Sequence, residues 1–369
     1  RGEVLGNIVS LMKNIVVSGS HGKTTTTSLI SNIFSNAKLD PTIINGGVLN
    51  SIGNSAKLGK SNWCILESDE SDGSFLKVPQ TYSIVTNIDK EHLDFYKSIE
   101  KLKLSFVEFI EKSPSFGKSF LCIDDKNIKK ILNKIKNKNY LTYGTNKDAN
   151  FCIENIYHNK NGCKFDIKIN IPGRKIFRLK KITIPIIGLH NIRNATAAVA
   201  VSYTIGISQS LIKKGLSKYK GVERRFNKIF KYRKSLFYDD YAHHPTEISE
   251  TLNAVKKSYI KKNIICIFQP HRISRLKNLK KQFSYSFLKA NTVILCPIYK
   301  AGENLSLGFE YDNFAKQIIK NSKVNLVIIK DQYNLAKYIK NNLVDENIVV
   351  GMGAGSISNW IRELPNLLK

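Results

Sequence analysis

A stretch of small and polar residues near the amino end of the chain has the composition of a phosphate-binding loop. It lies between an apolar run, 15–17, and a stretch of helical character, 24–37, and comprises Gly19, Ser20, His21, Gly22, Lys23, Thr24 and Thr25. A glycine loop at the start of a helix offers free backbone N–H groups and the positive end of the helix dipole to an anion. We expect the Lys23 ammonium to be exposed toward phosphate and the Thr24 hydroxyl to bind Mg²⁺. The sequence therefore predicts a site for a nucleoside triphosphate and magnesium.

The spacing of this loop differs from that of the common phosphate loop, because Val17 stands where the first glycine would be. The alternative interpretation is a tight strand-to-helix turn that carries a solvated lysine. The order of buried strand, glycine loop and helix favours the nucleotide site.

Polar side chains also follow the next two apolar runs of the chain, 63–66 and 83–86. The first run ends at an acidic stretch that starts with Glu67, and the second is followed by Asn87 and His92. Because ligands collect at the carboxyl ends of parallel strands, we expect these groups to meet the phosphate loop at one sheet edge. Glu67 comes directly off a buried strand and is our choice for a Mg²⁺ ligand. Capping and surface roles are expected for the other acidic residues of the stretch, Asp69, Glu70 and Asp72.

Two asparagines and two later loops add further candidate residues. Asn191 and Asn194 are three residues apart at the start of a small-residue helix, so they share a face and can reach one ligand. The alternative, N-capping, accounts only for Asn191. Two loops that follow later strands bring tyrosine, histidine and arginine to one sheet edge. The candidates in these loops are Asp240, Tyr241, His243, His271 and Arg275.

The elements that must position these residues alternate between apolar strands and helices, which implies an α/β fold with mostly parallel sheets. We expect a central phosphate-loop domain over 1–222 and a C-terminal Rossmann-like, doubly wound domain over 223–369. The alternating segment 151–184 predicts antiparallel strands, with turns at 161–162 and 172–173. The segment 1–12 is expected to be helical. The late glycines at 351, 353 and 355 indicate a close backbone turn.

Composition and charge indicate which classes of partner, such as membranes or nucleic acids, the chain is expected to bind. Of 369 residues, 42% are hydrophobic and 24% charged, as in globular proteins, and we find neither a signal-peptide pattern nor an apolar run of membrane-spanning length. The six cysteines are scattered without a C-x-x-C pair, which fits a reducing cytoplasm. The net charge of +29 raises the hypothesis of nucleic-acid binding, but the lysines are spread along the whole chain. We favour a compositional drift, with no specific nucleic acid and no membrane as partner.

Ordered motifs along the chain resemble those of the Mur ligases, which add amino acids to the peptidoglycan precursor. The motifs are Gly19-x-His21-Gly22-Lys23-Thr24-Thr25, Glu67-Ser68-Asp69-Glu70-Ser71-Asp72, Thr86-Asn87-Ile88-Asp89-x-x-His92, His190-Asn191-x-x-Asn194, Arg224-Arg225-Phe226, Asp239-Asp240-Tyr241-x-His243-His244-Pro245 and Gln269-Pro270-His271-Arg272. They run in register from Arg1 to the region of Trp360 and most resemble the family members that add L-alanine to UDP-N-acetylmuramate.

The resemblance implies a mechanism and a role for each candidate. ATP would phosphorylate the muramoyl carboxylate, and the alanine amine would displace phosphate from the acyl phosphate. The implied catalytic residues are Lys23, Glu67 and His92, and the implied metal ligands are Thr24, Glu67 and His92. Beyond the loop, ATP would contact Asn191, Asn194, Arg225 and Asp240, with Asp240 at the ribose. The other substrates would be contacted by Asn87, Tyr241, His243, His271 and Arg275.

The resemblance also implies an N-terminal domain of roughly 100 residues for the uridine nucleotide, which we expect to precede the segment 1–12. Closure of the two domains is expected to assemble the ATP site and exclude water. Within the family, the alternative is the recycling ligase that attaches a preformed tripeptide to the same sugar nucleotide. Outside it, the alternatives are a non-catalytic ATP-binding protein and a nucleic-acid-associated protein with a phosphate loop.

Overall fold

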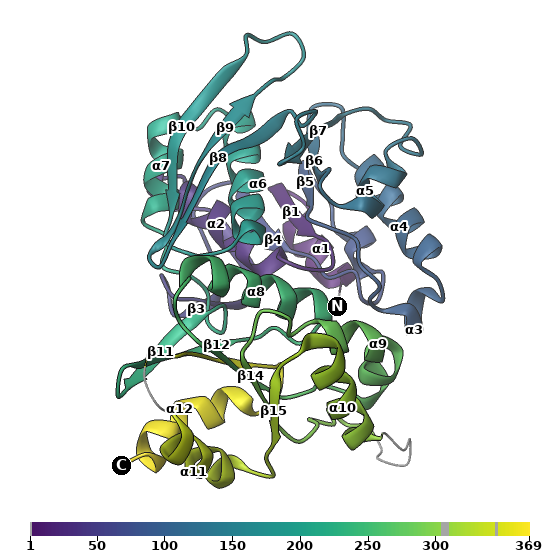
Figure 1. The fold of residues 1–369 in the computed structure, drawn as a ribbon. Coiled ribbons are helices and arrows are strands. Elements are labelled where there is room, and N and C mark those ends of the chain that lie inside the picture. Colours follow the sequence, from purple (N-terminus) through teal and green to yellow (C-terminus); the bar gives the residue numbers. More distant parts are fainter. Residues whose placement is uncertain (1, 304–309, 344–345) are drawn as a thin grey trace. The chain divides into compact units, whose positions relative to one another are not determined.

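The computed structural model describes residues 2–303, 310–343 and 346–369, so that Arg1, the first residue of the predicted leading helix, lies outside the described residues. The chain divides into two compact units, Arg1–Glu223 and Arg224–Lys369. Each unit is built on a mostly parallel sheet with helices (Figure 1), which confirms the predicted α/β fold class.

The sheet of the first unit has, within its described residues, the strand order β10-β9-β8-β7-β6-β5-β1-β4-β2-β3. Its parallel strands are β1 (Lys13–Ser18), β2 (Thr42–Leu49), β4 (Trp63–Glu67), β5 (Tyr82–Val85), β6 (Lys118–Cys122) and β7 (Tyr140–Gly144). Strand β1 pairs with β4 on one side and with β5 on the other. The two polar loops that follow β4 and β5 therefore begin on either side of the loop that follows β1.

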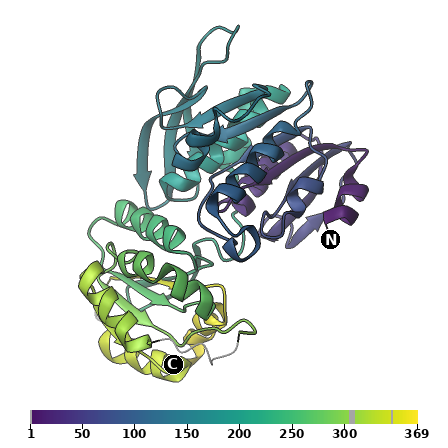
Figure 2. The same ribbon diagram turned by 90° about the vertical axis from the view of Figure 1, so that its right-hand side faces the viewer.

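Antiparallel pairs complete both edges of this sheet. These strands are β3 (Asn54–Lys57), β8 (Phe151–Asn159), β9 (Gly162–Ile169) and β10 (Phe177–Ile184). Strand β8 runs parallel to β7 and then pairs antiparallel with β9, so the predicted antiparallel segment extends the main sheet, as Figure 2 shows in teal. The prediction of antiparallel strands and of both turns in this segment is confirmed.

The helices of the first unit pack on a core of fully buried strand residues such as Val16, Ile65 and Ile84. They are α1 (Gly2–Val9), α2 (Lys23–Asn36), η1 (Ser74–Lys77), α3 (Leu93–Tyr96), α4 (Ile99–Glu111), α5 (Lys126–Ile131), α6 (Leu189–Ile205) and α7 (Gln209–Ser217). The run of four threonines in α2 is a poor helix former, but packing against α6 and α7 buries it. The leading helix ends at Val9, earlier than predicted, because β1 already begins at Lys13.

The sheet of the second unit has, over its described residues, the order β11-β12-β16-β13-β14-β15. Its strands are β11 (Asn227–Tyr232), β12 (Ser235–Asp240), β13 (Ile264–Phe268), β14 (Thr292–Leu295), β15 (Asn325–Ile328) and β16 (Ile348–Met352). All pairs are parallel except that of β11 with β12. The helices are α8 (Pro245–Ser258), α9 (Ile273–Tyr285), α10 (Tyr311–Ser322), α11 (Gln332–Asn342) and α12 (Ile357–Leu367).

Helices cover both faces of this second sheet (Figure 1). Helix α9 packs against α8 and α10, whereas α11 packs against α12. The core under α11 and α12 includes Phe237, Ile294, Leu335 and Ile361, all fully buried. Burial on both faces explains why the central strands read as continuous apolar runs.

Two predictions from composition can be compared with the structure directly. All six cysteines are described, and each is a buried free thiol. In the described part of the chain, no helix combines the length and apolarity that a membrane crossing requires.

Candidate functional site

The loop between β1 and α2 has the backbone geometry of an anion site. Gly22 has φ 85° and immediately precedes α2, and no side chain of the described residues caps that helix end. Gly19 has φ 125°, and a Cβ there would lie 2.2 Å from the Thr86 hydroxyl. Both positions therefore require glycine. The free N–H groups of the first turn of α2 point out of the loop and can bind phosphate.

Lys23 is buried within the loop, which corrects the expectation that its ammonium is exposed. The residue is 8% exposed, and Nζ donates hydrogen bonds to the Gly19 carbonyl at 2.8 Å and the Ser20 carbonyl at 3.4 Å. A third bond, also 2.8 Å long, goes to Oε2 of Glu70. The lysine is therefore held by contacts within the protein itself.

Glu70 was predicted to cap or to lie on the surface, and this prediction is wrong. Its side chain is fully buried and forms the ion pair with Lys23. Its Oε1 lies 3.8 Å from Nε2 of His92, and its backbone carbonyl accepts a hydrogen bond from the Tyr96 hydroxyl. The sequence of the acidic stretch predicted that carboxylates lie near the loop. Which of these carboxylates points inward depends on the path of the chain after β4.

The electrostatics of the loop keep Lys23 charged. Burial alone would lower the pKa of this ammonium, but the carboxylates of Glu70, Asp69 and Glu67 together outweigh burial and raise the pKa above its ordinary value. A permanent cation at the base of an anion site suits binding of a polyphosphate.

Thr24 and Glu67, two of the three predicted metal ligands, are in contact in the structure. The Thr24 hydroxyl donates to Oε1 of Glu67 at 3.1 Å, and Oε2 of Glu67 accepts a hydrogen bond of 2.7 Å from the Gly46 N–H. A hydroxyl and a carboxylate at this spacing are the oxygen donors that Mg²⁺ prefers. His92, the third predicted ligand, precedes α3 with φ 57° and groups with Asp69 and Glu70. Ligand atoms of these last three residues lie within 4.8 Å of one another.

Asn87 holds the phosphate loop in place. Its Oδ1 accepts from the His21 N–H and its Nδ2 donates to the His21 carbonyl, both at 2.9 Å. The Thr86 hydroxyl donates to the same carbonyl at 2.7 Å. The His21 ring in turn lies 3.1 Å from the Asp89 carboxylate. In the structure, Asn87 is thus a loop-positioning residue, a role that the expected substrate contact did not include.

Asn191 and Asn194 share one face of α6, as predicted from their spacing. Nδ2 of Asn194 lies 3.3 Å from Oδ1 of Asn191, and Asn194 packs against Gly22 of the phosphate loop. Gly188 is the N-cap of α6, so the alternative of capping by Asn191 is wrong. Instead, Nδ2 of Asn191 donates to the Ile187 carbonyl.

The second unit gathers its predicted residues into one cluster of rings and guanidinium groups. The Tyr241 and His243 rings meet edge to face with centroids 5.1 Å apart, and the His243 and His271 rings do so at 5.7 Å. Arg275 lies on α9, one turn after His271, and Nη1 donates to Nδ1 of His271 at 3.1 Å. Tyr299, which sequence reasoning missed, stacks on His271 at 5.6 Å.

Hydrogen bonds fix the tautomers of both histidines. His243 Nδ1 lies 2.9 Å from the Tyr241 carbonyl, which can only accept, so this nitrogen carries the proton. His271 Nδ1 accepts from Arg275, so its proton lies on Nε2. Burial, opposed by Glu247 and assisted by Arg275 and Arg225, lowers the pKa of His243 to about 4. Burial, then His243 and the nearby arginines, lower the pKa of His271 to about 4. Both rings are neutral at pH 7.

Arg225 and Asp240 border this cluster. The Arg225 guanidinium lies 5.5 Å from the Tyr241 ring centre and 3.9 Å from the Glu247 carboxylate. Asp240 is buried, and its Oδ1 accepts from the Ala242 N–H at 2.8 Å. Of the late glycines expected in a close backbone turn, Gly351 lies within β16, whereas Gly353 follows the strand with φ 148° and its carbonyl accepts from Arg224.

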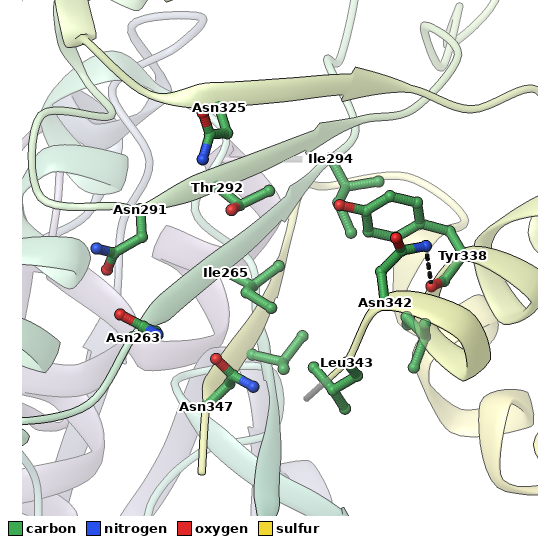
Figure 3. A pocket seen from close by; sticks show the side chains of 12 residues that line it. Asn263, Ile265, Asn291, Thr292, Ile294, Asn325, Tyr338, Asn342, Leu343 and Asn347 are labelled. Carbon is green, nitrogen blue, oxygen red and sulfur yellow. Dashed lines mark hydrogen bonds between the residues drawn. The ribbon is translucent and has the colours of Figure 1, made fainter. Parts of the chain in front are cut away.

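A cavity of about 530 Å³ lies in the second unit, near the amino ends of strands β13, β14, β15 and β16 (Figure 3). Asparagines 263, 291, 325, 342 and 347 line it over an apolar floor that includes Ile265 and Ile294. The candidate residues of this unit follow the carboxyl ends of the strands instead. The cavity is therefore separate from the candidate site.

Comparisons with known proteins agree with the motifs. Residues 17–202 match the Mur ligase middle domain, and residues 224–355 match the domain described as Mur ligase, glutamate ligase domain. UDP-N-acetylmuramate–L-alanine ligase of Pelagibacter ubique is 67% identical over 368 residues, which cover 100% of this chain and 79% of the relative. The ligase of the same name from Bartonella tribocorum is 38% identical, with 100% and 78% covered.

A solved structure supports the fold. The crystal structure of UDP-N-acetylmuramate–alanine ligase from Thermotoga maritima superposes with a TM-score of 0.78 at 23% identity. The similarity covers 96% of this chain and 75% of that one. At this level of identity, the comparison establishes the fold.

Proposed function

The chain belongs to the Mur ligase family, and we propose that it joins L-alanine to the carboxylate of UDP-N-acetylmuramate at the expense of ATP. The observation that carries this proposal is the group around the loop after β1. Within it, a buried ammonium, a hydroxyl and two carboxylates from neighbouring strand ends surround a helix start that can bind phosphate. The relatives of 67% and 38% identity carry the name of the alanine-adding ligase, which favours L-alanine over the tripeptide.

Two steps form the new amide bond. An oxygen of the muramoyl carboxylate attacks the γ-phosphorus of ATP, the bond from this phosphorus to the β–γ bridging oxygen breaks, and ADP leaves. The amine of L-alanine then attacks the acyl carbon, the bond to the phosphate oxygen breaks, and inorganic phosphate and a proton are released. Lys23 neutralises charge on the phosphates as they transfer, and the first-turn N–H groups of α2 orient them.

We propose that Thr24 and Glu67, together with His92 from its position beside Glu70, hold Mg²⁺ with the nucleotide. The hydroxyl and carboxylate oxygens of Thr24 and Glu67 already lie 3.1 Å apart, which fits this hard cation. When bound, magnesium supplies charge neutralisation between the phosphates and the acceptor carboxylate. Asn191 and Asn194, on the face of α6 next to Gly22, are the proposed contacts of adenine.

The cluster of the second unit is the proposed site for the amino acid. Arg275, which donates to His271 within this cluster, can form a charge-assisted fork with the alanine carboxylate. The neutral rings of His243 and His271 and the ring of Tyr241 complete the cluster. Arg225 and Asp240 are the proposed contributions of this unit to ATP binding, with Asp240 at the ribose. Asn87, in the first unit, is the proposed contact of the muramoyl group in addition to its loop contacts.

A product assay tests this proposal. The purified protein is incubated with Mg·ATP, UDP-N-acetylmuramate and either L-alanine or the tripeptide, and mass spectrometry detects the product while ADP release is measured. We expect the alanine adduct and one ADP for each product molecule. A tripeptide adduct in place of the alanine adduct would contradict the choice of substrate, and ATP binding without either adduct would support a non-catalytic role.

A further inference from the structure

We propose that Glu70 competes with nucleotide phosphate for the Lys23 ammonium, so that the buried ion pair opposes nucleotide binding and favours the release of ADP. In this role Glu70 is a positioning residue that acts through Lys23. The inference rests on the proposed use of this loop by ATP.

The hydrogen bonds of Lys23 show why binding requires an exchange. An ammonium group has three donors. In the structure, its acceptors are the carbonyls of Gly19 and Ser20 and the carboxylate of Glu70, at 2.8, 3.4 and 2.8 Å. All three donors are therefore directed at the protein itself. Phosphate oxygens can bind this ammonium only if one of the present acceptors is released.

Burial of the side chain and hydrogen bonds to the backbone carbonyl hold Glu70 in place. Its side chain is fully buried, and its carbonyl accepts hydrogen bonds from the Tyr96 hydroxyl and from the Gly73 N–H. Oε1 has no hydrogen-bond partner within the described part of the chain, and Nε2 of His92 is 3.8 Å away. When Lys23 turns to phosphate, a buried carboxylate stays behind close to the phosphate site.

This arrangement opposes nucleotide binding in two ways that act in the same direction. The ion pair must break, and the remaining negative charge then repels the phosphates across a poorly solvated distance. After the reaction, re-formation of the ion pair and repulsion between Glu70 and the phosphates both favour the release of ADP. Removal of the charge without a change in size should therefore tighten nucleotide binding. A residue with a purely structural role would weaken it.

Glu70→Gln is the test variant, because the amide keeps the size and an oxygen acceptor but loses the charge. Calorimetry measures the Kd of ADP and of a non-hydrolysable ATP analogue on the full chain in the presence of a chelator, which excludes metal binding by Asp69, Glu70 or His92. We expect binding about 10-fold tighter than wild type for both nucleotides. The dissociation rate of a fluorescent ADP should fall by a similar factor.

Two variants serve as controls. Asp69→Asn removes a carboxylate that lies 3.9 Å from the same ammonium but is 55% exposed, so its effect should stay below about 2-fold. Tyr96→Phe removes the hydrogen bond to the Glu70 carbonyl and keeps the charge, so it should not tighten binding. If Glu70→Gln does not fold, Glu70→Asp takes its place: its shorter carboxylate withdraws from Nζ, and binding should tighten to a smaller extent.

Unchanged or weaker nucleotide binding in a folded Glu70 variant would overturn the inference. An equal gain in nucleotide affinity in Asp69→Asn would also overturn it, because the gain would then come from the loss of any negative charge near the loop and not from the buried ion pair. Failure of the proposed use of this loop by ATP looks different, since neither nucleotide would then bind to the wild-type chain, and failure of the ligase function alone would appear only in the product assay.

Discussion

The ammonium of Lys23 and the carboxylate of Glu70 form a buried ion pair, with Nζ and Oε2 2.8 Å apart, in a loop suited to bind phosphate. The pair joins the helix start after β1 to the acidic stretch after β4, 47 positions along the chain. Because both side chains are shielded from water, loss of one partner leaves an uncompensated charge in the interior. Lys23 is thus expected to contribute both to the stability of the fold and to phosphoryl transfer.

Lys23→Ala is expected to abolish turnover and to lower the free energy of unfolding by about 3 kcal/mol, because Glu70 then stays buried without its counter-ion. ADP release in the presence of all substrates measures the first effect, and urea unfolding followed by circular dichroism measures the second.

The double variant Lys23→Ala/Glu70→Gln separates the two effects of the lysine. It should regain most of the lost stability, because no buried charge remains, while turnover stays abolished. Near-normal turnover in either variant would remove Lys23 from the catalytic site.

Glu67→Gln is expected to raise the Mg²⁺ concentration for half-maximal activity by at least about 10-fold, because one oxygen ligand loses its charge. The measurement is a magnesium titration of initial rates at a fixed concentration of ATP. Asp72→Asn is a matched control, since this carboxylate of the same stretch accepts from the Ser74 N–H and lies outside the proposed ligand set. Equal shifts in both variants would argue against Glu67 as a ligand.

Much of the first unit could be predicted from local sequence. Apolar runs of strand length ended at polar stretches, and the carboxyl ends of parallel strands meet at one edge, so the approach of Glu67 to the loop of Thr24 followed from the pattern. Asn191 and Asn194 followed from helical spacing alone. The antiparallel strands of 151–184 followed from alternation and turn residues.

The rest depends on contacts between distant segments. Whether Glu70 or Asp69 points inward is decided by the turn after β4, where Tyr96 from α3 binds the Glu70 carbonyl. The bracing of His21 by Asn87 requires the adjacency of β1 and β5, which no local pattern encodes. Tyr299 reaches His271 from the neighbouring strand end, beyond any motif in the sequence. In each case the partner is chosen by strand order.

The second unit should lose stability as the pH falls from about 6.5 to 4. Burial holds the pKa of His243 at about 4, below its unfolded value of 6.5, so the unfolded state binds the proton first. Stability is fully present above the unfolded pKa and is lost as the pH falls through the folded one. The contribution is about 3 kcal/mol, and the pKa from which it follows already includes the opposing effect of Glu247, which favours the charged ring.

Urea unfolding at a series of pH values checks this dependence. His243→Gln should reduce the slope of the curve between pH 4 and 6.5 relative to wild type, and His271, whose pKa is also about 4, should account for the slope that remains. His158→Gln, a change in the first unit, is the control and should keep the wild-type slope. The same slope in wild type and His243→Gln would show that other groups carry the acid sensitivity.

Arg275 is expected to govern the affinity for the amino acid, since its guanidinium donates to His271 beside the neutral ring of His243. Loss of a charge-assisted fork to the alanine carboxylate in Arg275→Ala should raise the KM for L-alanine by about 30- to 1000-fold, or roughly 2–4 kcal/mol. The KM for ATP should change much less, because the phosphate-binding groups lie in the first unit. Lys277→Ala removes an exposed positive charge from the same helix and should leave both constants within about 2-fold of wild type. A rise in the KM for ATP, with that for L-alanine unchanged, would assign this cluster to the nucleotide instead of the amino acid.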